Sequence, residues 1–128
     1  MPALTRPFAS VIVCTYNRLD SLKQCLRSLR QQSFKDFEVL VVDDASTDGT
    51  PAFLEESGQA FVRNPRNLGI AGARNAGVKA ARGEIVVFLD NDATALPDWL
   101  EHLLGSYSDP AVGGVGGKII NMPGSITG

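Results

Sequence analysis

Asp90, Asn91 and Asp92 are the residues of this sequence whose types and spacing point most directly to chemistry. They follow an apolar run at residues 84–89 that is predicted to form a buried strand. Two carboxylates one residue apart at a strand end offer the hard oxygen ligands that Mg²⁺ and Mn²⁺ prefer. A divalent ion held there can neutralise a diphosphate and stabilise it as a leaving group. The same tripeptide is also good turn chemistry, so taken alone it leaves a structural role open.

A second acidic pair, Asp43 and Asp44, ends another apolar strand, which is predicted at residues 37–42. A carboxylate in this place can accept a hydrogen bond from the ring N–H of a nucleobase, and we favour Asp44 for this role. Such a contact selects uracil or thymine over cytosine, because only the first two carry a ring N–H donor. The alternative is a turn followed by a helix cap, since residues 46–48 are all N-cap types.

Weaker signals lie after the first strand and on a later helix. Tyr16 can stack on a base or pack as an ordinary half-buried aromatic residue. Asn17 can cap a helix, and Arg18 can approach a phosphate or remain solvated. Arg74 lies in a segment rich in Ala and Gly, where it can clamp a diphosphate through two hydrogen bonds or serve as a surface residue.

The predicted order of strands and helices brings these side chains together. Strands are expected at residues 9–15, 37–42 and 84–89, with a short one at 60–63 and a strand or loop at 111–120. Alternation with helices favours a mainly parallel α/β sheet with right-handed crossovers. Ligands bind at the carboxyl ends of the strands of such sheets. Thr15, the Asp43–Asp44 pair and residues 90–92 all follow strand ends, so we expect them to share one edge.

The helices are predicted from apolar periodicity and from their ends. The first carries Leu19, Leu22, Leu26 and Leu29 at steps of three and four, with either Asp20 or a Ser21–Gln24 capping box at its start. The second has Pro51 in its first turn. The third covers residues 70–82, with Gly83 as its C-cap and small residues that suggest close packing on the sheet. The fourth covers residues 97–106.

Composition excludes several classes of protein. The chain has 128 residues, enough for one domain with a core, and a net charge of −2, so a nucleic-acid partner is not expected. No apolar run approaches the roughly 20 residues that span a bilayer. Cys14 and Cys25 lack metal-ligand spacing and are expected to be reduced residues of a cytoplasmic protein. Dinucleotide and phosphate-loop motifs are absent after the first strand.

Four segments in this order resemble the nucleotide-sugar-binding half of family-two glycosyltransferases of the GT-A fold. They are residues 10–18, 41–50, 67–77 and 83–92. The resemblance implies a Rossmann-like, three-layer α/β/α domain over residues 9–120, after a disordered lead-in at residues 1–8. It also implies inverting transfer of a sugar from a nucleotide-diphosphate sugar, with Mg²⁺ or Mn²⁺ as cofactor.

The resemblance also implies roles for individual residues. Tyr16 and Asp44 would contact the base, with Thr15, Asn17 and Arg18 nearby. Arg74 would approach the diphosphate. Asp90 and Asn91 would contact the ribose, and Asp92, with Asp90, would bind the metal as this chain's form of the Asp-x-Asp motif. Together with the residue-level reading, this favours a uridine or thymidine diphosphate sugar as donor.

Family members continue into an acceptor-binding half that carries the general base, and residues 121–128 read as a tail without one. We therefore expect the base beyond Gly128, nucleotide binding without efficient transfer, and self-association near residues 112–120. A longer parent protein could work at the cytoplasmic membrane face, and the acceptor is unassigned. Two alternatives are a sugar-phosphate nucleotidyltransferase, which lacks support because no Gly-rich basic loop follows the first strand, and a non-catalytic α/β nucleotide-binding module.

Overall fold

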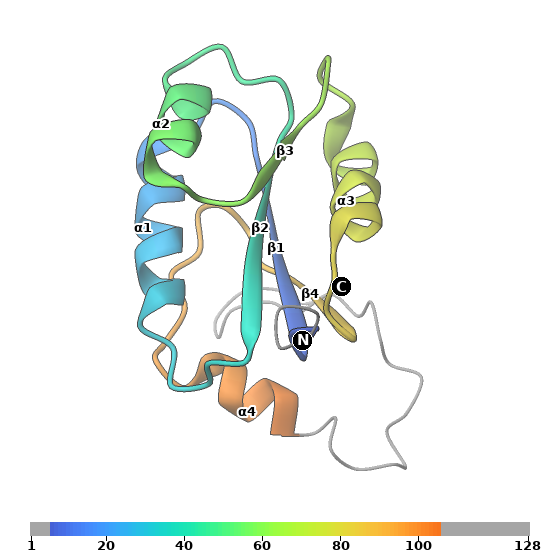
Figure 1. The fold of residues 1–128 in the computed structure, drawn as a ribbon. Helices are drawn as coiled ribbons and strands as arrows, with labels where there is room; N and C mark the ends of the chain where they lie inside the picture. The colour runs from blue at the N-terminus through green and yellow to red at the C-terminus, as the bar shows by residue number, and fades with distance from the viewer. Residues whose placement is uncertain (1–5, 106–128) are drawn as a thin grey trace.

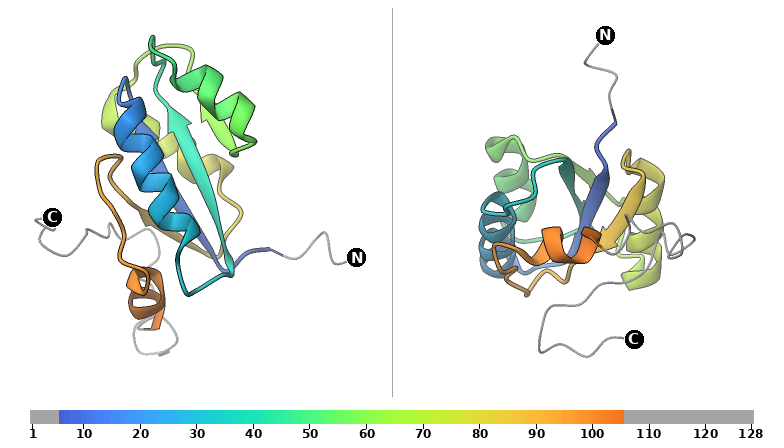
Figure 2. Two further views of the ribbon diagram at one scale, coloured as in Figure 1. Left: turned by 90° about the vertical axis from the view of Figure 1, so that its left-hand side faces the viewer. Right: turned by 90° about the horizontal axis from the view of Figure 1, so that it is seen from below.

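The protein forms a single parallel sheet between layers of helices. The structure is a computed structural model and describes residues 6–105. Four strands pair in the order β3-β2-β1-β4, and all neighbours are parallel. Their bounds are β1 Ala9–Thr15, β2 Phe37–Asp43, β3 Phe61–Arg63 and β4 Ile85–Phe88. Helices cover both faces, with α1 and α2 on one side and α3 on the other (Figure 1, and Figure 2, right). The predicted three-layer α/β architecture is confirmed.

The central strands β1 and β2 bury side chains on both faces, and these alternating side chains belong to two separate clusters. Val11, Val13 and Val41 pack with the leucines of α1 and with Leu54. Ile12 and Val42, one position along, pack with Ala73 of α3 on the opposite face. This is the arrangement expected of apolar, β-branched strands in a parallel sheet.

Helix α1 spans Leu19–Arg30 and buries Leu22, Leu26 and Leu29, as the periodicity predicted. Its N-cap is Arg18, which makes no side-chain capping bond. The predicted caps at Asp20 and at Ser21 are therefore wrong, because the helix begins one residue before Asp20 and both residues lie inside its first turn. Helix α2, Thr50–Ser57, has Pro51 in its first turn as predicted, and its N-cap is Gly49.

Helix α3 spans Gly69–Ala80 and packs tightly on the sheet. A Cβ on Gly77 would lie 2.6 Å from Ile12 Cγ2, which confirms the predicted role of small residues. The predicted C-cap at Gly83 is wrong, because the helix ends at Ala80 and its C-cap is Ala81, which has an extended conformation. Gly83 is instead required by close packing, since a Cβ there would lie 2.5 Å from the carbonyl carbon of Ala9.

The last described helix, α4, spans Trp99–Gly105, two residues later at its start than predicted. It lies near the amino ends of the strands (Figure 1), and Trp99 and Leu100 join the core there. The predicted strand or loop at residues 111–120 lies outside the described residues.

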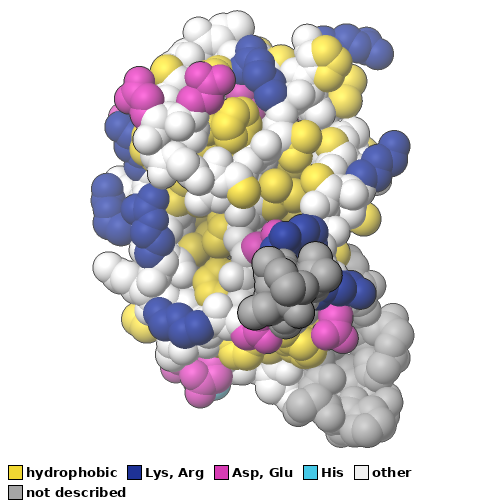
Figure 3. Space-filling model, in the orientation of Figure 1, with side chains coloured by type: hydrophobic (Ala, Val, Ile, Leu, Met, Phe, Trp, Pro, Cys, Tyr) yellow, Lys and Arg dark blue, Asp and Glu magenta, His cyan; other side chains and the backbone are white. Residues whose placement is uncertain are grey.

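Within residues 6–105 no helix is both long enough and apolar enough to cross a membrane. Figure 3 shows acidic and basic side chains interspersed over the face that it draws.

Register places the strand ends side by side. Thr15 pairs with Asp43, and Asp43 pairs with Arg63, so β1, β2 and β3 end in one row. The pairing of β4 with β1 stops at Phe88 opposite Ile12, and Leu89 N–H then donates to the Ile12 carbonyl. The residues that follow these four strands therefore share the carboxyl edge of the sheet.

Candidate functional site

A pocket of about 250 Å³ lies over the carboxyl edge, between the strand ends and the start of α3. Its walls come from the end of β1, the residues that follow β1 and β2, the loop before α3 and the first turns of α3: Cys14, Thr15, Tyr16, Asp44, Asn67, Gly69, Ile70 and Ala73. A smaller recess of about 30 Å³ adjoins it and shares Cys14 and Ile70. Arg74, Phe88, Asp90 and Asn91 line this recess. Six of the predicted site residues thus surround two adjoining cavities.

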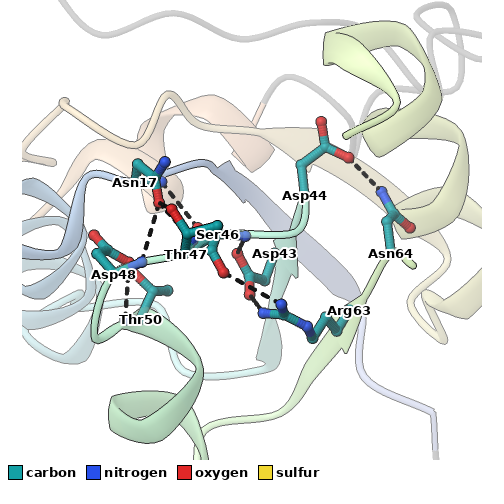
Figure 4. A network of polar contacts seen from close by, with 9 residues as sticks. All are labelled: Asn17, Asp43, Asp44, Ser46, Thr47, Asp48, Thr50, Arg63 and Asn64. Atoms are coloured by element: carbon teal, nitrogen blue, oxygen red, sulfur yellow. Dashed lines mark hydrogen bonds and ion pairs between the residues drawn. The ribbon is translucent and has the colours of Figure 1, made fainter. Parts of the chain in front are cut away.

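Asp44 lies at the pocket with its carboxylate held by three donors. Asn64 Nδ2 and Leu68 N–H donate to Oδ1 at 2.8 and 2.9 Å, and Gly69 N–H donates to Oδ2 at 3.0 Å. Figure 4 shows the contact with Asn64, which follows β3. The side chain is only 5% exposed. These bonds fix the orientation of the carboxylate beside the pocket.

Asp43, the other carboxylate of the pair, is fully buried. Arg63 Nη1 donates to its Oδ2 at 2.6 Å, and Ser46 N–H donates to its Oδ1 at 3.1 Å. Arg63 also donates to the Ser46 carbonyl (Figure 4). Asp43 therefore ties β3 to the loop after β2 and does not line the pocket.

Asn17 connects the loops that follow β1 and β2. Its Oδ1 accepts hydrogen bonds from the N–H groups of Thr47 and Asp48, and its own N–H donates to Ser46 Oγ (Figure 4). Its φ is 53°, in the left-handed region that Asn tolerates better than most residues. Asn17 is thus not the predicted helix cap but a bridge between loops. It fixes the loop that places Tyr16, 45% exposed, at the pocket.

Arg18 and Asn91 meet near the smaller recess. Arg18 is exposed, and its carbonyl accepts a hydrogen bond from Asn91 Nδ2 at 3.4 Å. Asn91 is 8% exposed, and its Oδ1 has no hydrogen-bond partner within the described part of the chain. The same holds for the Oγ1 of Thr15 in the larger pocket. Both oxygens belong to residues that line the cavities, although the oxygen atoms themselves are buried.

Arg74 brings a positive charge to the recess. Its guanidinium carbon lies 5.2 Å from the centre of the Phe88 ring, and this cation–π contact holds the half-buried side chain toward the sheet.

Burial raises the pKa of the neighbouring Cys14 thiol to about 11, although the charge of Arg74 acts in the opposite direction. Burial likewise raises the pKa of Cys25 to about 12, and Asp90 and Asp92 add to this effect. Both thiols are protonated at neutral pH.

Asp90 and Asp92 are the exposed carboxylates beside the recess. Asp90 lines it, whereas Asp92 lies two residues farther along, past the buried Asn91. Within residues 6–105 no three His, Cys, Asp or Glu side chains gather as a metal cage. A pair of exposed carboxylates nevertheless fits Mg²⁺ or Mn²⁺ in sites where one or two carboxylates share the ion with water and substrate phosphates. The donor set is therefore compatible with the predicted ion.

Sequence reasoning missed the groups that hold Asp44 and complete the pocket wall. Asn64 and the N–H groups of Leu68 and Gly69 come from a segment that reads only as a turn-rich loop. Ile70 and Cys14 line both cavities and read as ordinary packing residues. The one available signal was the density of Asn and Gly at residues 64–69, which marks backbone N–H groups free of a regular element.

Fold and pocket together define a nucleotide-binding class of α/β domain, in which the ligand lies across the carboxyl edge of a parallel sheet. Comparison with known proteins identifies the family. The model of glycosyl transferase family 2 matches residues 10–127, and the chain belongs to this family. It is 34% identical over 122 residues to the glycosyltransferase AglE of Haloferax volcanii, covering 90% of this chain and 40% of AglE.

Two solved structures show the same fold. The mannosyltransferase PcManGT of Pyrobaculum calidifontis, in complex with GDP-Man and Mn²⁺, superposes with a TM-score of 0.78 at 35% identity, covering 86% of this chain and 35% of that one. S. aureus TarS in complex with UDP-GlcNAc gives a TM-score of 0.72 at 34% identity, covering 78% and 31%. The predicted GT-A fold and glycosyltransferase family are therefore confirmed. This chain spans about a third of the length of the curated relatives that it matches.

Proposed function

We propose that this chain binds a nucleotide-diphosphate sugar along the carboxyl edge of its sheet. The observation that carries the proposal is the gathering of Asp44, Arg74 and Asp90 around two adjoining cavities. Asp44 lines the larger cavity, and Arg74 and Asp90 line the smaller one that adjoins it. A carboxylate for the base, a guanidinium for the phosphates and a carboxylate for a metal are the groups that a nucleotide diphosphate would need.

The larger pocket is the proposed base site. Tyr16 offers an exposed ring beside it, and Thr15 offers a buried hydroxyl without a partner among residues 6–105. Asp44 presents a fixed carboxylate that can accept a base N–H. We assign uridine or thymidine rather than cytidine as the nucleoside, because uracil and thymine carry a ring N–H donor and cytosine does not. The loop that carries Asn17 and Arg18 holds Tyr16 in place.

The smaller recess and its rim are the proposed ribose and diphosphate site. We assign Asp90 and Asn91 to the ribose hydroxyls, because both residues line this recess. Arg74 would contact the diphosphate oxygens. Asp92, with Asp90, would hold Mg²⁺ or Mn²⁺, which when bound neutralises charge on the leaving diphosphate. PcManGT, solved with GDP-Man and Mn²⁺, supports a divalent ion without identifying it here.

The proposed reaction is inverting transfer of the sugar to an acceptor hydroxyl, in a protein that supplies the acceptor site. Such a transfer requires a general base to remove the proton of the hydroxyl as it attacks. We assign no residue in the range 6–105 to that role. For this chain the proposal is donor binding, and the sugar and the acceptor are unassigned.

Calorimetric titration with UDP, dTDP, GDP and CDP, each with and without Mn²⁺, tests the donor site. We expect UDP or dTDP to bind, and Mn²⁺ to strengthen the binding. Asp92→Ala should remove the effect of Mn²⁺ because it takes away the proposed metal carboxylate. The matched control is Asp36→Ala, an exposed carboxylate beside the start of β2, at the opposite edge of the sheet. Folded wild-type protein that binds none of the four nucleotides would contradict the proposal.

A further inference from the structure

The hydrogen bonds already made by Asp44 limit what a base can add to them. An ionised carboxylate offers about four lone-pair positions, two on each oxygen. Oδ1 accepts from Asn64 Nδ2 and from Leu68 N–H, at 2.8 and 2.9 Å, so both of its positions are filled. Oδ2 accepts from Gly69 N–H at 3.0 Å, and within residues 6–105 no second donor reaches it. One lone-pair position remains, on a residue that lines the pocket.

This arrangement is fixed by the backbone on both sides. Asn64 is 5% exposed, and its own N–H donates to the Asp43 carbonyl at 2.9 Å, so the side chain starts from an anchored position beside Asp44. Gly69 has a φ of 82°, a left-handed conformation that allows the successive N–H groups of Leu68 and Gly69 to point at one carboxylate. The Gly69 N–H is shared with Asn67 Oδ1.

We propose that Asn64 is a positioning residue that restricts Asp44 to a single hydrogen bond with the base. The inference rests on the proposed donor site and adds a rule for the base. Uracil and thymine present one ring N–H between two carbonyl groups and match one free position. Guanine presents two adjacent donors, its ring N–H and its 2-amino group, which pair with a carboxylate only if both oxygens are free. The 2-amino group of guanine should therefore gain nothing here.

The comparison of GDP with inosine diphosphate tests this rule on the wild-type chain. The two ligands have the same size and the same ring N–H, and only GDP carries the 2-amino group. We expect inosine diphosphate to bind as well as GDP or better, and UDP to bind better than CDP. A carboxylate with two free oxygens would instead favour GDP by about 10-fold, since leaving the amino group unpaired then has a cost. A preference of that size in the wild type would overturn the inference.

Asn64→Ala tests the positioning role. The substitution frees a lone-pair position on Oδ1, so the affinity ratio of GDP to inosine diphosphate should rise by about 3- to 10-fold. A general loss of order would weaken both ligands without changing this ratio. The control is Gln59→Ala, which also removes a side-chain amide. Gln59 precedes β3, whereas Asn64 follows it, and its amide donates to the carbonyls of Val39 and Ala60 instead of to Asp44. A ratio that stays at the wild-type value in folded Asn64→Ala would overturn the role of Asn64.

The outcomes separate this inference from the proposed function. If no nucleotide binds to the folded wild-type chain, the donor site is wrong and the inference falls with it. If nucleotides bind and GDP exceeds inosine diphosphate by about 10-fold, the donor site stands and only the inference falls. If Asn64→Ala does not fold, the wild-type ratio still decides whether Asp44 offers one position or two.

Discussion

Asp43 and Asp44 are adjacent in the sequence, yet their carboxylates have different surroundings. Asp43 is closed off by Arg63 and by the Ser46 N–H, and nothing of it reaches the pocket. Asp44 is equally well hydrogen-bonded but forms part of the pocket wall. Both residues are buried, but only Asp44 lines the pocket. We therefore assign Asp43 to the stability of the loop and Asp44 to the ligand.

Replacement of Asp44 by Asn should lower both stability and nucleotide binding. All three protein groups around the carboxylate are N–H donors, and the NH₂ of an asparagine would face at least one of them. Leaving a buried donor without an acceptor costs about 1–3 kcal/mol, so we expect the free energy of unfolding to fall by that amount. Urea denaturation measures it, and calorimetry with UDP should show no binding. The exposed Asp20→Asn is the control, and equal stability of the two variants would contradict the argument.

Single residues show where sequence reasoning succeeds and where it stops. The strand-end carboxylates could be placed because their positions follow from apolar runs and from the parallel order of the sheet. The partners of Asp44 could not, because Asn64 reaches it only through the pairing of β2 with β3, and strand register is not visible in one sequence. Asn17 was read as a cap, whereas it bonds to residues about thirty positions later in the chain.

Helix α3 is the element that brings Arg74 and the pocket wall against the sheet. Its contact with the strands depends on Gly77, whose missing side chain lets the helix approach Ile12 and Val42. An ordinary helix would gain from alanine at this position by up to about 1 kcal/mol. Here the added Cβ would lie 2.6 Å from Ile12 Cγ2 and 3.1 Å from Val42 Cγ2, closer than packed atoms tolerate.

Gly77→Ala should therefore destabilise the protein, in spite of its better helix propensity. Overpacking of a core typically costs about 1–3 kcal/mol, and we expect the net loss to lie at the lower end of that range. Chemical denaturation measures the change. Gly105→Ala, at the end of α4, provides the comparison, because a Cβ there meets no atom of residues 6–105 within 4 Å. If Gly77→Ala proved as stable as Gly105→Ala, the space between α3 and the sheet would accept a methyl group, and the argument from close packing would be wrong.

Elements were easier to predict than their ends. β1 was predicted with its observed bounds, since a short run of apolar β-branched residues has few other uses. Helix starts were less successful because the N-cap residues of α1, α2 and α3 make no side-chain capping bond. The carboxylate of Asp48, which accepts from the Thr50 N–H, lies one residue before the N-cap of α2. At these starts the chain is held by contacts between loops, such as those of Asn17 and Asp43, and these depend on the assembled sheet.

At the scale of the whole molecule, the sheet separates two apolar layers, and the pocket opens at the polar strand ends on the side of the layer that packs under α3. The α/β class and the shared edge could be derived from the alternation of elements, because parallel strands leave little freedom in where their ends lie. The cavity itself could not be derived. Its walls include Cys14 and Ile70, whose side chains carry no chemical signal and become part of the site only through packing.

Cys14 links this packing to the stability of the whole fold at alkaline pH. Burial raises the pKa of its thiol from 9.0 to about 11, so the folded state keeps a proton that the unfolded state releases. Stability from this residue is fully present below pH 9 and declines as the pH rises toward 11. The slope is at most about 1.4 kcal/mol per pH unit. Urea denaturation at pH 7, 9, 10 and 11 should give a steeper decline for the wild type than for Cys14→Ala. Lysine and tyrosine titrations are common to both proteins and cancel in the comparison. Parallel curves for the two would show that the thiol is not held in an environment that disfavours its charge.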